Sequence, residues 1–191
     1  MAVGFRLAAF ALTGLALFGQ AGIQTTQLRF APGGQVSMDL ASGDYDLEPG
    51  SGDWIVVTWE QGASEAPKVR LTGSGAQASL SIARTPHQGF HVKVALPARC
   101  DLRVRLTAGN LSLGPLEGNK DLAIRAGNLR VAVPQPGLYG PVHASVWAGN
   151  IHADAFGGEK DGLFRSFDWQ GTGAYALHAA IWAGNITLSR P

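Results

Sequence analysis

The chain has 191 residues, of which 26 are glycine and only 15% are charged, and its formal net charge at pH 7 is +1. This balance excludes a nucleic-acid-binding protein that depends on a strong basic excess, and the low charge excludes a disordered, highly charged tail protein. Abundant glycine with few charges is typical of short strands joined by tight turns, so we expect one or two all-β units.

Residues 1–21 have the pattern of a secretory signal peptide. Arg6 precedes an apolar run from about Leu7 to Phe18, and Gly19-Gln20-Ala21 supplies the small residues of a cleavage site. The run is shorter than the about 20 residues that a membrane helix needs. We therefore expect an exported protein, either periplasmic, on the outer surface or secreted, with no integral membrane segment after cleavage. The alternative is an uncleaved N-terminal anchor.

Residues 22–100 contain short, less regular strand patterns. Period-two alternation covers residues 36–41, 45–47, 78–82 and 90–96. Ser42-Gly43-Asp44 is a looser relative of a corner motif that recurs later. The only cysteine, Cys100, excludes an internal disulfide and is expected to be a buried apolar residue. We expect this region to begin or cap the structure formed by residues 101–191.

Residues 101–191 contain the tripeptide Ala-Gly-Asn four times, each copy preceded by alternating apolar residues and followed by Leu or Ile. Such self-similarity is typical of a repeat architecture. The spacing between successive corner glycines is 18, 22 and 35 residues. The corner residues expected to have a structural role are Gly109, Asn110, Gly127, Asn128, Gly149, Asn150, Gly184 and Asn185.

Two folds are compatible with these corners. In one, Gly-Asn is the two-residue loop of a type II′ hairpin, which gives a meander or sandwich. In the other, glycine lets the chain turn a corner, successive corners stack, and the Asn side chains form a hydrogen-bonded ladder. The apolar alternation has the same phase before every corner, and the corners follow at similar spacings. Both features favour stacking, so we expect a parallel β-helix-like solenoid. Residues 155–175 form either an additional strand of the stack or a hairpin that leaves it.

The alternation assigns a direction to each side chain of the repeats. It directs the corner alanines Ala108, Ala126, Ala148 and Ala183 inward, where only a small side chain fits. It directs Thr107, Arg125, Trp147 and Trp182 outward, with Arg125 on the strand next to Trp147. An outward aromatic column beside an arginine suits a flat ligand such as a sugar, although covered packing residues are the alternative.

His143 and His178 occupy equivalent positions and lie on the same expected outer face. On adjacent strands they would be about 4.8 Å apart and could share a metal ion; with a strand between them they would be about 10 Å apart and could not. A third ligand is not evident, and the glycine-rich turn with Asp154, Glu159 and Asp161 is expected to be solvated. We expect no metal and no cofactor.

Motifs for nucleophilic, phosphate-binding or dinucleotide chemistry are absent from the sequence. The nearest carboxylate cluster is Asp39, Asp44 and Asp46, the kind of group that a glycan-cleaving β-helix enzyme would need. We expect a non-enzyme that acts in surface interaction or as an envelope scaffold. Its partner would be a cell-surface glycan or an envelope protein, bound at Arg125, Trp147, Trp182, His143 and His178. The alternatives are a glycan-acting enzyme and a purely structural assembly domain.

Two further motifs carry a resemblance to a known family. Leu96-Pro97-Ala98-Arg99-Cys100-Asp101-Leu102 leads into the repeats, and the stretch 167–177 followed by Gly184-Asn185-Ile186 closes them. Over residues 36–190 the chain resembles the bacterial family of unknown function labelled putative adhesin. The resemblance implies an exported all-β domain with a right-handed β-helix-like core, and it implies no catalytic residues.

Overall fold

The computed structural model describes residues 22–61, 66–86 and 89–191, which confirm the expected all-β class. The expected signal peptide, residues 1–21, lies outside the described residues. Helical structure within the described ranges is limited to two single 3-10 turns. The elements are β1 (Gly22–Arg29), β2 (Gln35–Leu40), β3 (Asp44–Pro49), β4 (Trp54–Gln61), β5 (Lys68–Ser74), β6 (Gln77–Ala83), β7 (His91–Leu96), β8 (Asp101–Leu113), β9 (Lys120–Ala132), η1 (Pro136–Leu138), β10 (Tyr139–Ala153), η2 (Asp154–Phe156), β11 (Gly158–Gln170) and β12 (Tyr175–Ser189).

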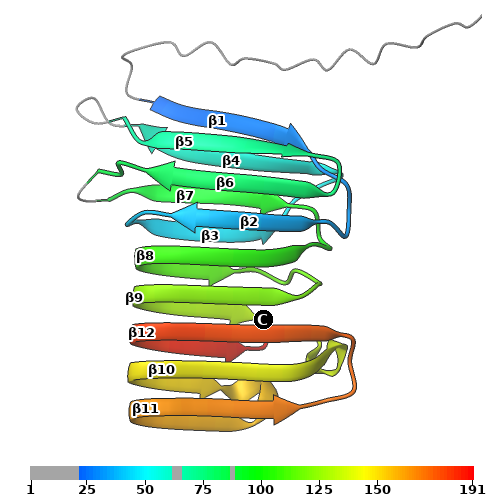
Figure 1. Ribbon diagram of the computed structural model, residues 1–191, viewed down its shortest axis with the longest axis vertical. Helices are drawn as coiled ribbons and strands as arrows, with labels where there is room; N and C mark the ends of the chain where they lie inside the picture. Colours follow the sequence, from blue (N-terminus) through cyan, green and yellow to red (C-terminus); the bar gives the residue numbers. More distant parts are fainter. Residues whose placement is uncertain (1–21, 62–65, 87–88) are drawn as a thin grey trace, which may run out of the picture.

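The strands form one mixed sheet that does not close. Its main path runs β1-β4-β7-β3-β8-β9-β12-β10-β11, and β2, β6 and β5 branch from β8. Pairing is parallel from β8 through β9 and β12 to β10, and antiparallel at both ends of the row. Figure 1 shows the long strands one above another, each bending back at the same edge of the molecule.

Each long strand has two arms joined at the Ala-Gly-Asn corner. The first arm of β8 pairs with β2 and its second arm pairs with β3, so Ser42-Gly43-Asp44 is the equivalent corner of the N-terminal region. The two regions therefore belong to one continuous sheet. The hairpin interpretation of Gly-Asn is wrong, because β8, β9, β10 and β12 continue as strands through their corners.

The order of the last three strands differs from their order in the sequence. β12 inserts between β9 and β10, with Ala183 opposite both Ala126 and Ala148. β11 pairs antiparallel with β10 at the end of the row, so residues 158–170 form a hairpin partner that closes the stack. The expectation that Arg125 is adjacent to Trp147 is therefore wrong, because the strand that carries Trp182 lies between them.

The core lies between the two arms. In β8, Leu102, Val104 and Leu106 are buried on the first arm, and Leu111 and Leu113 on the second. Leu106 and Leu111 are five positions apart, so strict alternation would place them on opposite faces. The corner shifts the phase by one residue, as a bulge does, and this shift directs both arms onto the same core.

The corner glycines approach one another too closely for any side chain. Gly109, Gly127, Gly149 and Gly184 have φ angles from +118° to +139°. A Cβ atom on Gly127 would overlap the carbonyl oxygen of Gly109, and a Cβ atom on Gly184 would overlap that of Gly127. Glycine is required here by both the backbone angle and the contact between strands.

The asparagine next to each of these glycines takes part in a row of hydrogen bonds along the stack. Asn110 donates from its side chain to Asp44 (2.7 Å), Asn128 to Asn110 (2.9 Å) and Asn185 to Asn128 (2.8 Å). Asn150 joins differently, through its backbone N–H to Asn185. These bonds connect five strands at one edge and fix their register.

The structure corrects one expectation for the interior and adds an unexpected buried charge. The corner alanines are not in the core: Ala126 is exposed and Ala108, Ala148 and Ala183 are half-buried, because the chain already turns there. An inward position next to Leu102 and Leu177 is occupied by Lys120, which is 2% exposed. Its Nζ donates to the carbonyl of Gly118 (2.9 Å) and lies 5.1 Å from the centre of the Tyr139 ring.

Candidate functional site

The candidate site lies on the outer face of the first arms, beside the corners. Trp182 on β12, Trp147 on β10 and Phe164 on β11 follow one another across the sheet and form what we call the aromatic column. Their exposed fractions are 57%, 41% and 70%, respectively. The three side chains are therefore exposed in the monomer while they contact one another.

The rings of the aromatic column are in mutual contact. The rings of Trp147 and Trp182 are parallel, with an interplanar angle of 3° and centroids 4.6 Å apart. Phe164 contacts Trp147 edge to face, with ring centroids 5.2 Å apart. Parallel rings at the spacing of adjacent strands are ordered before any ligand binds, which lowers the entropic cost of binding.

Among the described residues, only one face of the Trp182 ring contacts another aromatic ring, and we call the other face the free face. Trp147 covers one of its faces, and the other face points along the stack toward β9, because the ring separation matches the strand separation. The β9 residue between the paired positions 124 and 126 is Arg125, which is exposed. Within the described ranges, Arg125 takes part in no ion pair and in no cation–π contact.

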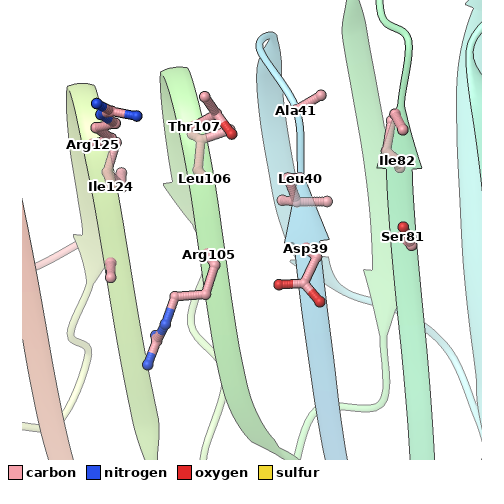
Figure 2. Close-up of a pocket in the computed structure, with 12 residues that line it drawn as sticks. Asp39, Leu40, Ala41, Ser81, Ile82, Arg105, Leu106, Thr107, Ile124 and Arg125 are labelled. Atoms are coloured by element: carbon pink, nitrogen blue, oxygen red, sulfur yellow. The ribbon is translucent and has the colours of Figure 1, made fainter.

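A shallow hollow of about 570 Å³ begins at Arg125 and extends over β9, β8, β2 and β6. Figure 2 shows Arg125 and Thr107 side by side on neighbouring strands, with Ala41 beyond them. From Trp182 the outer side chains of this row are Arg125, Thr107 and Ala41, so they become short beyond Arg125, where the hollow opens. Arg105 and Asp39 supply further polar groups to the hollow.

A second row, which we call the His–Asp row, runs parallel to the aromatic column. It consists of Asp121, His178, His143 and Asp168 on β9, β12, β10 and β11. The two imidazoles stack with centroids 5.4 Å apart, and their Nδ1 atoms lie 3.3 Å from Asp121 and 2.6 Å from Asp168. The two histidines are thus on adjacent strands, and each uses one ring nitrogen on a carboxylate.

Asp121 also receives a hydrogen bond from Arg105 at 2.7 Å. This hydrogen bond is the main cause that holds the pKa of the Asp121 carboxyl below its ordinary value, and the His178 contact adds to it. Arg105 is therefore occupied by Asp121, and Arg125 is the nearest exposed cation to Trp182 along the sheet. Short side chains, Ala180 and Ser145, separate the His–Asp row from the two tryptophans.

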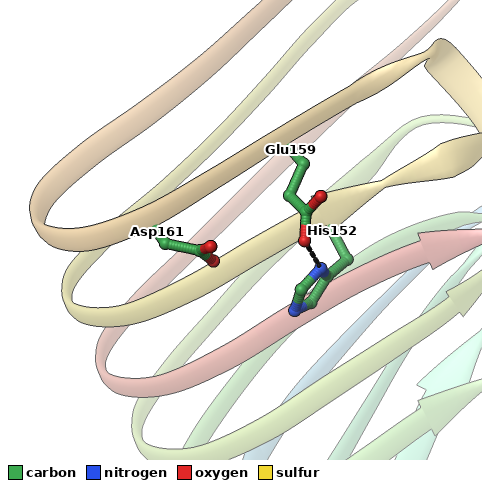
Figure 3. A group of neighbouring side chains, drawn as sticks. All are labelled: His152, Glu159 and Asp161. Atoms are coloured by element: carbon green, nitrogen blue, oxygen red, sulfur yellow. Dashed lines mark ion pairs between the residues drawn. The ribbon is translucent and has the colours of Figure 1, made fainter.

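A separate donor cluster lies on the second arm of β10 and on the beginning of β11, which pairs with it. The donor atoms of His152, Glu159 and Asp161 are all within 4.8 Å of one another, and His152 Nδ1 lies 2.8 Å from Glu159 (Figure 3). An imidazole and two carboxylates can coordinate a divalent cation. Asp154, which we grouped with Glu159 and Asp161 from the sequence, belongs to η2 and is not part of this cluster.

The three carboxylates suggested for glycan cleavage do not act together. Asp44 accepts hydrogen bonds from Asn110, and Asp46 lies 3.2 Å from His91 on the neighbouring strand. Asp39 is on the other arm, where it lines the hollow beside Arg105. The pair of carboxyl groups facing one scissile bond that a glycosidase needs is therefore not formed by these residues.

The sequence analysis missed several members of these groups. Phe164 lies in a segment that has no Ala-Gly-Asn corner. It comes to lie beside Trp147 only because β11 pairs antiparallel with β10. Asp121 and Asp168 were not recognised as partners of the histidines. For Asp121 a signal was available, because it occupies the repeat position equivalent to His143 and His178.

Comparisons with known proteins give likeness of fold. No family model and no curated protein sequence matches the chain. A putative cell adhesion protein from Clostridium sporogenes has 10% sequence identity and a TM-score of 0.57, over 90% of this chain and 100% of that one. A putative adhesin from Bacteroides fragilis has 7% identity and a TM-score of 0.28, over 91% and 100% of the two chains. A putative lipid binding protein from Parabacteroides distasonis has 13% identity and a TM-score of 0.33, over 60% and 59%. Only the first superposition is close enough to support a common fold.

Among the residues that the structure describes, no helix has both the length and the apolar character needed to cross a bilayer.

Proposed function

We propose that the protein is an exported, non-enzymatic adhesin that binds a cell-surface glycan at the aromatic column. The observation that carries the proposal is the stacked, exposed pair Trp147 and Trp182 beside the hollow that begins at Arg125. Ordered aromatic faces bind the apolar faces of sugar rings, and neighbouring polar side chains bind the hydroxyl groups. The fold shared with a protein described as a putative cell adhesion protein supports the same role.

The size of the exposed patch favours a small ligand over a protein. With the exposed fractions of Trp147, Trp182 and Phe164 (41%, 57% and 70%), the aromatic column exposes roughly 350–450 Å². A stable protein interface buries about 800 Å² on each partner. A glycan that stacks on the column needs no larger surface.

We also propose that the bent strands are coils of a right-handed β-helix-like solenoid whose ends are capped by antiparallel strands. The parallel register of the four corners supports this architecture. It accounts for the site, because identical positions on successive coils place like side chains in rows. The expected signal at residues 1–21 supports export to the periplasm, the outer surface or the medium.

The proposed function is tested with a glycan array, using the protein without residues 1–21 and a double variant, Trp147→Ala with Trp182→Ala. We expect the unsubstituted protein to bind a subset of glycans and the double variant to bind none of them. Trp54→Ala is the matched control, because Trp54 is 42% exposed but lies on β4, outside the column. Equal binding by the double variant and the unsubstituted protein would contradict the proposal. Concentration-dependent assembly without glycan binding would instead favour a structural assembly domain.

A further inference from the structure

We infer that the ligand is an acidic glycan, whose sugar ring stacks on the free face of Trp182 and whose carboxylate pairs with Arg125. The inference rests on the proposed function and assigns a substrate class and an orientation to that site. It treats the two tryptophans as unequal: Trp182 contacts the sugar, and Trp147 supports Trp182 from behind.

The first step concerns the ring faces. The faces of Trp147 are occupied by Trp182 on one side and by the edge of Phe164 on the other. Trp182 has only one covered face and remains 57% exposed, against 41% for Trp147. A flat ligand can therefore stack on Trp182 without displacing a ring, whereas stacking on Trp147 would require Phe164 or Trp182 to move.

The second step concerns the space. A sugar ring stacked on the free face of Trp182 shares the outer position over β9 with the side chain of Arg125, which must then lie along the edge of the sugar. On β8 the outer side chain is the short Thr107, and the shallow hollow continues beyond it. The glycan chain would thus run perpendicular to the strands, from β12 toward β8. The sugar units that follow the stacked ring would lie in the hollow. Thr107, Asp39 and Ser81 offer hydroxyl and carboxylate groups to their hydroxyls.

The third step concerns charge. The other two arginines on the first arms, Arg103 and Arg105, lie 3.6 Å and 2.7 Å from the carboxylate of Asp121. Arg125 takes part in no such pair among the described residues and stands next to the free ring face. A guanidinium binds a carboxylate through two parallel hydrogen bonds, with a directional preference that a neutral hydroxyl does not share. The carboxylate of a uronic acid, which projects from the edge of the sugar ring, matches this arrangement.

The inference is tested by titration calorimetry with short uronic acid oligosaccharides, each paired with its fully methyl-esterified form, which keeps the sugar ring and removes the charge. The variants are Trp182→Ala, Trp182→Tyr, Trp147→Phe and Arg125→Gln. Arg130→Gln is the matched control, because Arg130 is exposed on the second arm of the same strand. A melting curve for each variant verifies folding.

We expect the unsubstituted protein to bind at least one acidic oligosaccharide about tenfold more tightly than its ester, a difference that one charge-assisted pair supplies. Trp182→Ala should weaken binding of both forms about tenfold or more, and Trp182→Tyr should restore part of it. Trp147→Phe should have a smaller effect. Arg125→Gln should abolish the preference for the acid while the ester binds as before, and Arg130→Gln should change neither.

The outcomes separate the two proposals. If glycans bind but acids and esters bind equally, or if Arg125→Gln keeps the preference, the acidic ligand is refuted while the glycan-binding function stands. If Trp147→Phe is as damaging as Trp182→Ala, the assignment of the free face is refuted. If neither the array nor the oligosaccharides show any binding, the function and the inference are both refuted.

Discussion

Gly127 and Gly109 lie in register on adjacent strands, so close that a Cβ atom on Gly127 would overlap the carbonyl oxygen of Gly109. The φ angle of Gly127 is +135°, a conformation that residues with a side chain rarely adopt. A residue with a side chain at position 127 would therefore suffer both backbone strain and an overlap with Gly109. The same relationship recurs at every corner, from Gly43 to Gly149.

We predict that Gly127→Ala lowers the free energy of unfolding by about 2–4 kcal/mol. Urea denaturation followed by circular dichroism measures the change. Gly137→Ala is the control, because a Cβ atom there meets nothing within 4 Å and the φ angle is not positive, so its effect should stay within about 0.5 kcal/mol. Equal stability of the two variants would show that the corner contact is not tight.

The side chain of Asn128 donates to Asn110 and accepts from Asn185, so it connects three strands. We predict that Asn128→Ala costs about 1–2 kcal/mol of unfolding free energy, since two hydrogen bonds are lost at a partly solvated edge. Asn128→Asp keeps the acceptor for Asn185 but cannot donate to Asn110, so its cost should fall between zero and that of alanine. An aspartate variant less stable than the alanine variant would contradict this account, and denaturation midpoints at neutral pH decide it.

Lys120 places an ammonium group in the core, and burial lowers the pKa of this lysine to about 8. In the unfolded chain the pKa is near 10.4, so between these values the unfolded state binds more protons than the folded state. The contribution of Lys120 to the free energy of unfolding therefore increases with pH, by on the order of 1 kcal/mol between pH 7 and pH 9.

We predict that Lys120→Met removes this pH dependence and is at least as stable as the unsubstituted protein at pH 7, because an apolar side chain can replace a buried charge. Denaturation midpoints from pH 6 to pH 9 test it. Tyr139, whose ring lies 5.1 Å from the Lys120 Nζ, does not ionise in this range, since burial raises its pKa to about 12. A variant that keeps the full pH dependence would show that another group is responsible.

Asp121 is hydrogen-bonded to Arg105, which lowers the pKa of its carboxyl. Its contribution to stability is present above the ordinary aspartate pKa of about 4 and is lost as the pH falls through the lowered pKa of the folded state. Asp121→Asn should therefore destabilise the protein at pH 7, by less than about 1 kcal/mol since the side chain is 39% exposed, and should have little effect near pH 2. Asp154→Asn, at an exposed residue of η2, is the control, and acid unfolding curves are the measurement.

The local features of the fold follow from period-two alternation and from the repeated tripeptide. The outward direction of Trp147 and Trp182 and the buried positions of Leu106 and Ile124 needed only that pattern. The order of the strands in the sheet could not be predicted from this pattern, because any copy of a repeat can pair with any other copy. The last repeat in the sequence, β12, therefore lies in the middle of the parallel row.

The candidate site was predictable in part for the same reason. Both tryptophans are evident from the sequence, but the free face of Trp182 depends on β12 lying next to β9. The inward Lys120 was missed because a charged residue at a core position is read as a strand end. The corner alanines were assigned inward because alternation was carried through a bulge that breaks it.

The most direct test of the account is the fluorescence of Trp147 and Trp182 during a titration with a glycan that the array selects. The fluorescence of the unsubstituted protein should be quenched by iodide, and bound glycan should protect it. The variant with Trp147→Phe and Trp182→Phe should lose both the quenching component and the protection, while Trp54→Phe keeps the protection. If the glycan leaves the quenching unchanged, or if the double variant shows the same protection as the unsubstituted protein, the aromatic column is not the binding site.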